Sequence, residues 1–323
     1  MKNLKPILLI LSLAAAPLAQ AITPVEPPKT NPQVAGYYQY NMGNMQITAL
    51  LDGTNYLSPN LFKGLTEQES QDILKKYYAV NDKGVQTSVN AFLVNDGMYL
   101  HLVDTGAASC FGDHLGSVYD NLVASGHQPE KVDTIVLTHL HPDHICGISK
   151  DGADRYPNAR IFVSETEYDY WLGEGQAEKM SEAKRAGFIA TVEKIKQALQ
   201  PYQDRRVVFK FNKDQKIDRF TVIESKGHTP GHHGFSLKSQ DQEIVFIGDI
   251  VHSHTLQFER PETAVNFDID PEQAVQTRLK YFAEYAKDGQ TIAAPHLPFP
   301  GIGHIYSKDG KSYQWIPVHF KNW

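Results

Sequence analysis

Cysteine, long apolar runs and basic clusters are all scarce in this chain of 323 residues. Two cysteines are too few for a fold built on a disulfide framework, although an exported chain could form one bond between them. The 31 Lys and Arg are outnumbered by 37 Asp and Glu, and no basic patch predicts binding to nucleic acid. Beyond the N-terminal region, no apolar stretch reaches the length of a membrane span. What remains is the composition of an ordinary globular protein, 41% hydrophobic and with a formal net charge of −6.

Residues 1–21 have the layout of a secretory signal peptide. Lys2 and Lys5 precede an apolar run, and Ala19-Gln20-Ala21 resembles a cleavage site. The apolar run is too short to span a bilayer, so we expect its removal and an exported, periplasmic protein without a membrane anchor. Residues 22–45 begin with a proline-rich stretch and are expected to form an extended N-terminal arm.

Strand patterns occur in two groups, separated by a helical region around residues 164–200. The first group contains a strand over Met45–Leu51 closed by a turn at Asp52-Gly53, then a hairpin over Val89–Val94 and Tyr99–Val103. In the helical region apolar residues recur at helical spacing. Four further strands, a helix at Pro271–Ala286 and a last strand at Thr291–Ala294 follow. Two strand groups with helices between and after them predict an α/β layered domain over 46–323.

The densest group of chemically active side chains follows an apolar, β-branched run that ends at Leu137. It places four ligand-type residues in six positions: His139, His141, Asp143 and His144. In extended chain His139 and His141 point to the same side, and the proline after them turns the backbone, so that Asp143 and His144 approach a second point. Two ligand pairs on one corner predict a site for two metal ions.

Three later strand ends supply further ligand types. His228 projects from a tight loop rich in Gly and Pro, Asp249 ends the next strand, and His296 ends the last. Zinc accepts each of these side chains. Without sulfur, the set also suits iron, manganese or cobalt, so the spacing leaves the identity of the metal open.

Asp104 and the two cysteines are further candidates for roles at this site. Asp104 follows the predicted strand Tyr99–Val103. We expect Asp104 to orient a ligand histidine, because the ligand set is complete without it. Cys146, two residues after His144, could be a thiolate ligand or a redox partner of Cys110. The interpretation that we favour is that both are small buried side chains beside the site.

With its ligands in this order, the sequence resembles the metallo-β-lactamase-fold hydrolases over nearly all of the chain after the signal peptide. Within that superfamily it is similar to the methyl parathion hydrolase and lactonase branch. The similarity lies in four strings: Val103–Ala108 (VDTGAA), His141–His144 (HPDH), Gly227–His232 (GHTPGH) and His296–His304 (HLPFPGIGH).

This resemblance implies a four-layer αββα sandwich with two divalent ions, most readily Zn²⁺, at one edge of the paired sheets. It divides the ligands as follows: His139, His141 and His228 on one ion, Asp143, His144 and His296 on the other, and Asp249 bridging both. A hydroxide held between the ions would attack the substrate, with Asp249 and Asp143 as the catalytic residues.

The resemblance also implies an aromatic substrate pocket formed by Phe111, Trp171 and Phe188. Periodicity alone would make Trp171 and Phe188 core residues, and the resemblance reverses that preference. An apolar mouth without a cluster of Lys or Arg favours a neutral lactone, ester or phosphotriester as the small-molecule substrate. His252 and His254 depart from the branch and could contact the substrate or support the ligands.

The leading prediction is therefore an exported dinuclear metallohydrolase. A β-lactam hydrolase of the same fold, a mononuclear-iron sulfur dioxygenase and a metal-binding protein without activity are the alternatives. The complete bridging set argues against the last, because storage needs no open coordination position. The apolar loop pairs Tyr56-Leu57 and Leu61-Phe62 are interpreted as simple packing, with a lip over a cleft or a homodimer contact as alternatives.

Overall fold

A computed structural model describes residues 35–205, 207–212 and 215–321 of the chain. The predicted signal peptide and the part of the predicted arm up to residue 34 lie outside these residues. Among the described helices, none is long and apolar enough to cross a membrane.

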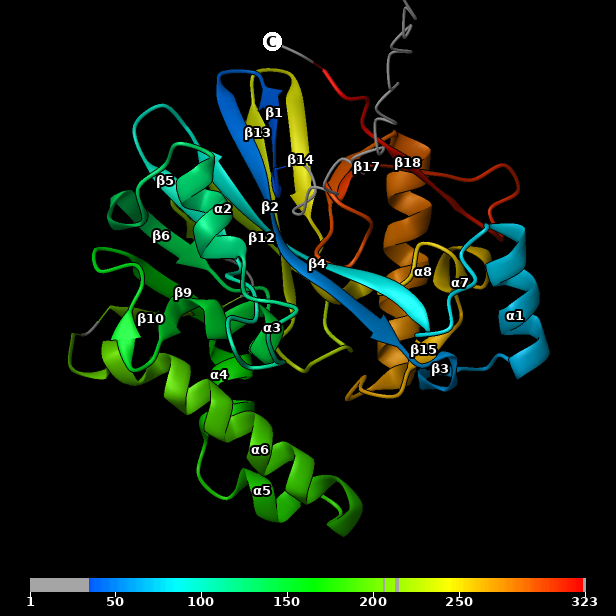
Figure 1. Cartoon of the computed structure of the whole chain (residues 1–323), viewed down its shortest axis with the longest axis horizontal. Helices are drawn as coiled ribbons and strands as arrows, with labels where there is room; N and C mark the ends of the chain where they lie inside the picture. Colours follow the sequence, from blue (N-terminus) through cyan, green and yellow to red (C-terminus); the bar gives the residue numbers. More distant parts are fainter. Residues whose placement is uncertain (1–34, 206, 213–214, 322–323) are drawn as a thin grey trace, which may run out of the picture. The chain divides into compact units, whose positions relative to one another are not determined.

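Most of the strands lie in two large sheets (Figure 1). The strands of the first sheet are, in spatial order, β1 (Tyr37–Met42), β2 (Met45–Leu57), β4 (Val85–Asn95), β5 (Leu100–Val103), β6 (Val132–Val136), β9 (Arg160–Ser164) and β10 (Val208–Phe211). Pairing is antiparallel from β1 to β5 and parallel from β5 to β10.

The second sheet is formed by the C-terminal half of the chain. Its strands are, in spatial order, β11 (Lys216–Ile217), β12 (Phe220–Glu224), β13 (His233–Ser239), β14 (Gln242–Phe246), β16 (Thr291–Ala293), β17 (Ile302–Tyr306) and β18 (Gln314–Pro317). Only β14 and β16 pair in parallel. Two short ribbons complete the described strands: β3 (Phe62–Lys63) with β15 (Ala264–Val265), and β7 (Ser149–Lys150) with β8 (Ala153–Asp154).

Helices cover the outer faces of both sheets. The described α-helices are α1 (Glu67–Lys76), α2 (Val118–Ala124), α3 (Pro142–Ile145), α4 (Glu165–Leu172), α5 (Gln176–Lys179), α6 (Glu182–Leu199), α7 (Leu256–Glu259) and α8 (Pro271–Asp288). Figure 1 shows α4, α5 and α6 on the side of β9 and β10, and α8 on the side of β17 and β18.

Three apolar cores lie between these layers. Phe92 and Val136 of the first sheet meet Phe235 and Phe246 of the second in the central core. A second core joins the outer face of the first sheet to α2, α4 and α6, and a third joins the outer face of the second sheet to α8. The order is helix, sheet, sheet, helix, so the predicted αββα sandwich is confirmed.

Local sequence signals explain several element boundaries. The hairpin of β4 and β5 forms as predicted, around the Asn95-Asp96-Gly97 turn. Thr66 caps α1 in a capping box, in which its side chain accepts from Glu69 N and the side chain of Glu69 accepts from Thr66 N. Asp270 caps α8, Pro271 opens its first turn, and Gly289 ends it in the left-handed region.

Two predicted boundaries near the N-terminus were wrong. The arm was expected to extend to residue 45, but Tyr37–Met42 form the edge strand β1, because each residue from 37 to 42 has a partner in β2. The strand from Met45 was expected to turn at Asp52-Gly53, yet β2 continues to Leu57 through a bulge. Gly53 is needed there because a Cβ would lie 2.2 Å from His114 O.

Candidate metal centre

The predicted ligands come together where strands of both sheets end. His139 to His144 follow β6, His228 follows β12, Asp249 follows β14, and His296 follows β16. Pro142 opens the short helix α3 and His141 precedes it as the N-cap. Because β14 and β16 are parallel, their carboxyl ends lie at the same edge of the second sheet.

The side chains form the groups that the sequence predicts. One group consists of His139, His141, His228 and Asp249; a second consists of Asp143, His144 and His296. Within each group the ligand atoms lie within 4.8 Å of one another. A third, overlapping group adds a residue outside the predicted set, since His252 lies with Asp249 and His296.

Asp249 is the centre of the cluster. Its Oδ2 lies within 4 Å of five imidazole nitrogens, those of His139 (3.6 Å), His144 (3.3 Å), His228 (3.3 Å), His252 (3.1 Å) and His296 (3.1 Å). One carboxylate shared by this many histidines from both groups has the position of a bridging ligand.

The donor atoms fit divalent metal ions. His139 Nε2, His144 Nε2 and Asp249 Oδ1 are buried and have no hydrogen-bond partner. Buried polar atoms are rarely left unpaired, because desolvation without a partner is costly. Nitrogen and carboxylate donors converging without sulfur are the ligands of zinc and related ions.

The charges in the cluster also favour bound cations. Burial alone would raise the pKa of Asp249, but the histidines around it hold the pKa well below its usual range. Burial lowers the pKa of His139 and His141 well below the usual value, so both present lone pairs. Burial alone would lower the pKa of His228, but Asp249 and Asp268 raise it to about 9. The carboxylates therefore stabilise positive charge at this point.

The other ring nitrogens of three histidines are held by oxygen acceptors. His144 Nδ1 lies 2.9 Å from Asp104 Oδ2, His228 Nδ1 lies 2.8 Å from Asp268 Oδ1, and His296 Nδ1 lies 2.9 Å from Ser88 O. Each acceptor directs the Nε2 lone pair of its histidine towards the cluster. Asp104 is thus placed where a residue that orients a ligand must be. Asp268 was not foreseen.

His232 supports the loop that carries Asp249. Its Nε2 accepts from Asp249 N at 2.8 Å, and burial lowers its pKa to about 3, so the ring is neutral. Gly248 beside it has a φ of +55°, and a Cβ there would lie 2.4 Å from His232 Nε2. The tight turn that presents Asp249 therefore requires both residues.

A cavity of about 340 Å³ opens onto the cluster. Four of the predicted ligands line it: His141, Asp143, Asp249 and His296. The rest of the lining is apolar (Leu57, Leu61, Val89, Phe111, Pro142, Phe267) or polar (Asn55, Thr87, Thr191, Lys194, His252). The volume and the mixed lining are those of a small-molecule site. His252 faces this cavity, whereas His254 lines a separate one.

Of the three predicted pocket aromatics, only Phe111 lines the cavity. Trp171 and Phe188 stack with centroids 5.0 Å apart and belong to the buried core under α4 and α6, which corrects the prediction from resemblance. Helical periodicity indicated this burial correctly. Trp171 does pack edge-on against His141, with ring centroids 5.5 Å apart, so it supports a predicted ligand from the core.

The interpretation of the cysteines as free buried side chains was also wrong. Cys110 and Cys146 form a disulfide, with Cα atoms 6.3 Å apart. The bond joins the loop of Phe111 to the segment directly after His144. A sequence with two cysteines 36 positions apart does not reveal this proximity.

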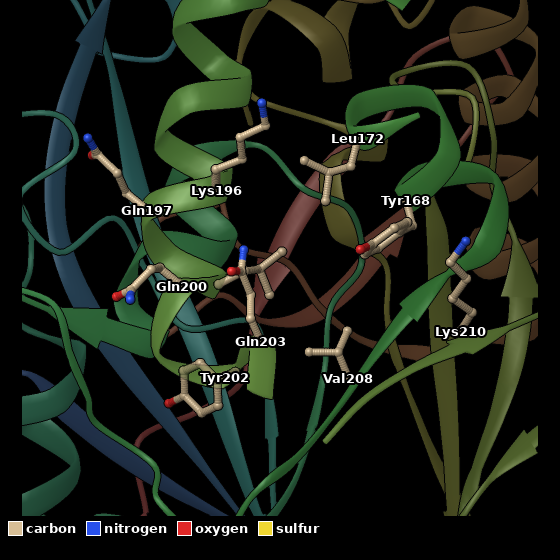
Figure 2. A pocket seen from close by; sticks show the side chains of 10 residues that line it. Tyr168, Leu172, Lys196, Gln197, Gln200, Tyr202, Gln203, Val208 and Lys210 are labelled. Atoms are coloured by element: carbon tan, nitrogen blue, oxygen red, sulfur yellow. The ribbon is translucent and has the colours of Figure 1, made fainter. Parts of the chain in front are cut away.

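A larger cavity of about 600 Å³ lies elsewhere, between α4, α6 and β10 (Figure 2). Leu172, Leu199 and Val208 supply its apolar lining, and Lys196 and Lys210 its charges. Lys210 is already paired with Asp169 at 2.5 Å. None of the predicted site residues lines this cavity, so size alone does not mark the site.

The fold and the metal cluster define a family. Residues 84–296 match the model of the metallo-beta-lactamase superfamily, which is more than half of the chain, and the chain belongs to this superfamily. The predicted family is thereby confirmed.

Similar proteins are hydrolases and lactonases, and one of them is a dizinc enzyme. A crystal structure of the hydrolase AbOPH is 64% identical, with a TM-score of 0.89 over 90% of this chain and 100% of that one. AidC, a dizinc quorum-quenching lactonase in complex with a homoserine product, is 26% identical, with a TM-score of 0.79 over 89% of this chain and 99% of that one. The N-acyl homoserine lactonase AttM of Agrobacterium fabrum is 25% identical over 195 residues, 55% of this chain. That match spans 63% of AttM. The prediction of a hydrolase agrees with these relatives.

Proposed function

We propose that this protein is an exported metal-dependent hydrolase that opens a neutral lactone or a related ester. The observation that carries the proposal is the convergence of unpaired, buried donor atoms from His139, His144 and Asp249 beneath a cavity of about 340 Å³. A structural metal site would be closed, whereas this cluster borders a space that a small molecule can enter.

Two divalent ions bound in this cluster would supply an activated water and polarise the oxygen of the electrophile. The chain contributes the geometry. His139, His141 and His228 form one ligand group, and Asp143, His144 and His296 form the other, with Asp249 between them.

The lining of the cavity supports a neutral substrate with an apolar part. Leu57, Leu61 and Phe267 offer apolar surface, and Lys194 is the one Lys or Arg of the described lining. A phosphodiester or nucleic acid would require more positive charge. The lactonase activity of AidC and AttM supports a lactone ahead of a phosphotriester.

Export is supported by the disulfide between Cys110 and Cys146, because such bonds persist in oxidising compartments. The homodimer has less support than the sequence implied. Leu57 and Leu61 line the cavity and Phe62 is buried, so these residues are explained without a second copy. The homodimer stays a prediction, which size-exclusion chromatography with light scattering would test.

The test is hydrolysis of a panel of lactones, aryl esters, a phosphotriester and a chromogenic β-lactam by the purified protein. We expect lactone hydrolysis that disappears after chelation and returns with Zn²⁺. Asp249→Ala should reduce kcat/KM by at least about 100-fold, since even outer partners of metal ligands contribute 10–100-fold. Exposed Asp241→Ala is the matched control.

Metal analysis separates the alternatives. Two zinc ions with hydrolytic turnover support the proposal. A single iron with oxygen consumption would indicate a sulfur dioxygenase, and stoichiometric metal without turnover on any substrate would indicate a binding protein. A β-lactam as the preferred substrate would move the protein to another activity of the same fold.

A further inference from the structure

Glu167 on α4 is a buried carboxylate that the proposed chemistry does not use. Its exposed fraction is 0%, and no ion pair among the described residues includes it. A carboxylate is rarely buried without a cation, because desolvation of the charge is costly. Its surroundings must therefore supply other stabilising groups.

Those groups are hydrogen-bond donors from two ligand-bearing loops and from Trp171. Glu167 Oε1 accepts from Leu140 N at 3.0 Å and from Trp171 Nε1 at 2.7 Å. Glu167 Oε2 accepts from Gly231 N at 3.0 Å. The two oxygens of one carboxylate thus hold two different segments of backbone.

Both segments carry ligands of the same group. Leu140 lies between His139 and His141, and Gly231 lies in the loop that begins with His228. These three histidines form the first ligand group with Asp249. No hydrogen bond of Glu167 reaches the group of Asp143, His144 and His296 among the described residues.

Gly231 brings α4 close enough for this contact. A Cβ on residue 231 would lie 2.2 Å from Glu167 N and 2.6 Å from Glu167 Cα. Atoms at these distances would overlap, so any side chain at 231 would separate the loop from the start of α4. The loop of His228 and the carboxylate therefore fit only with glycine here.

We propose that Glu167 is the positioning residue of the first metal ion: it fixes the His139–His141 loop and the His228 loop at the separation that one ion requires. The inference rests on the proposed function only in taking the cluster as a metal site. Glu167 touches neither the ligand atoms nor the cavity, and it acts through the backbone between the ligands. Only a carboxylate can do this, because each of its oxygens accepts and both loops offer N–H donors.

The test is a Zn²⁺ titration of the metal-free protein by chelator competition, with Glu167→Gln as the variant. The amide keeps the size of the side chain but has a single acceptor oxygen, so its NH₂ must face one of the two N–H donors. We expect two ions in the wild type, and in Glu167→Gln one ion bound as before and the other bound about 10–100-fold more weakly. Glu165→Gln, on the exposed side of the same helix, should bind both ions as the wild type does.

A double-mutant cycle shows which ion is affected. His228→Ala removes a ligand of the first ion and leaves the second group complete. In that background Glu167→Gln should not change the affinity of the remaining ion. An equal loss in both backgrounds would mean that Glu167 supports the fold in general, and would overturn the proposal.

Gly231→Ala provides a second variant should Glu167→Gln not fold, as judged by circular dichroism. It keeps the carboxylate but separates it from the His228 loop, and the same selective weakening is expected. Two ions bound with wild-type affinity in either folded variant would contradict the positioning role. A wild-type protein that binds no Zn²⁺ in the titration would refute the metal centre itself, and both proposals with it.

Discussion

At the scale of single residues, three of the metal-facing imidazoles are oriented by an oxygen acceptor at the other ring nitrogen. Asp104 serves His144, and Asp268 serves His228. The two histidines belong to different ligand groups, so variants of Asp104 and Asp268 should affect different ions. Asp268 also accepts from Val265 N through its second oxygen, which fixes the carboxylate itself.

Replacement of Asp268 tests this arrangement. In Asp268→Asn the amide has one acceptor oxygen for two donors, so either His228 or Val265 loses its partner. We expect a 10–100-fold weaker Zn²⁺ affinity for one ion, measured by competition with a chromophoric chelator. Asp270→Asn is the control, because Asn caps α8 as well as Asp does. Unchanged affinity in Asp268→Asn would show that His228 needs no such partner.

At the scale of elements, the loop between β5 and α2 forms the wall of the cavity that carries Phe111. It is fastened at two points. Asp52, in the bulge of β2, accepts from Ala107 N at 2.9 Å and from Val118 N at 3.1 Å. Cys110 is joined to Cys146 beside the His139–His144 corner. The long connection is thereby held against the ligands without secondary structure of its own.

Removal of the disulfide should destabilise the protein rather than abolish the fold. For a closed loop of 36 residues, the chain-entropy estimate is about 3–4 kcal/mol of unfolding free energy. We expect the double variant Cys110→Ala, Cys146→Ala to lose about this amount in urea unfolding. Tris(2-carboxyethyl)phosphine, a reductant without zinc-binding thiols, should destabilise the wild type similarly and leave the double variant unchanged. Two titratable thiols in the untreated wild type would show that the bond does not form.

At the scale of the whole described domain, a polar cluster joins the two sheets. Asp218, in the turn between β11 and β12 of the second sheet, accepts from Thr134 Oγ1 at 2.6 Å and from Arg160 at 2.7 Å, both in the first sheet. Arg219 Nε donates to Asp96 Oδ2 at 2.7 Å, in the hairpin of the first sheet. Thr134 and Arg160 thus donate from the first sheet to the second, and Arg219 donates from the second to the first.

Because of this cluster, we expect the free energy of unfolding to depend on pH in the acidic range. Burial alone would raise the pKa of Asp218, but the hydrogen bonds from Thr134 and Arg160 outweigh it and lower the pKa below its usual 3.8. The folded chain thus binds this proton less readily than the unfolded chain. The stabilisation is complete above the unfolded pKa and is lost as the pH falls through the folded pKa.

Asp218→Asn should therefore lower the free energy of unfolding by about 1 kcal/mol at pH 7, a modest value because the pair with Arg160 is partly exposed. The difference from the wild type should shrink below pH 3.8. Urea unfolding at pH 7 and pH 3 measures it, with exposed Asp241→Asn as the control. Loss of metal ions in acid affects all three proteins alike. A difference independent of pH would rule out the carboxylate as its source.

The sequence by itself determined the family, the layered fold and the seven predicted ligands. Strand periodicity fixes which residues end a strand, and ligand types such as His139 and Asp249 are visible in the letters because their chemistry is in the side chain. The capping box at Thr66 and the Pro271 start of α8 are likewise local signals.

Only the tertiary structure decided which residues hold those ligands and which form the cavity. Glu167 is one of several acidic residues in the first turn of a helix, and Asp268 lies two positions before an ordinary N-cap; neither differs from a solvated carboxylate until distant loops meet it. The same holds for Cys110 and Cys146, and for Trp171 and Phe188, which the resemblance placed in the pocket and packing placed in the core. Such roles depend on distances between segments far apart in the chain, and a single sequence encodes these distances only through the complete fold.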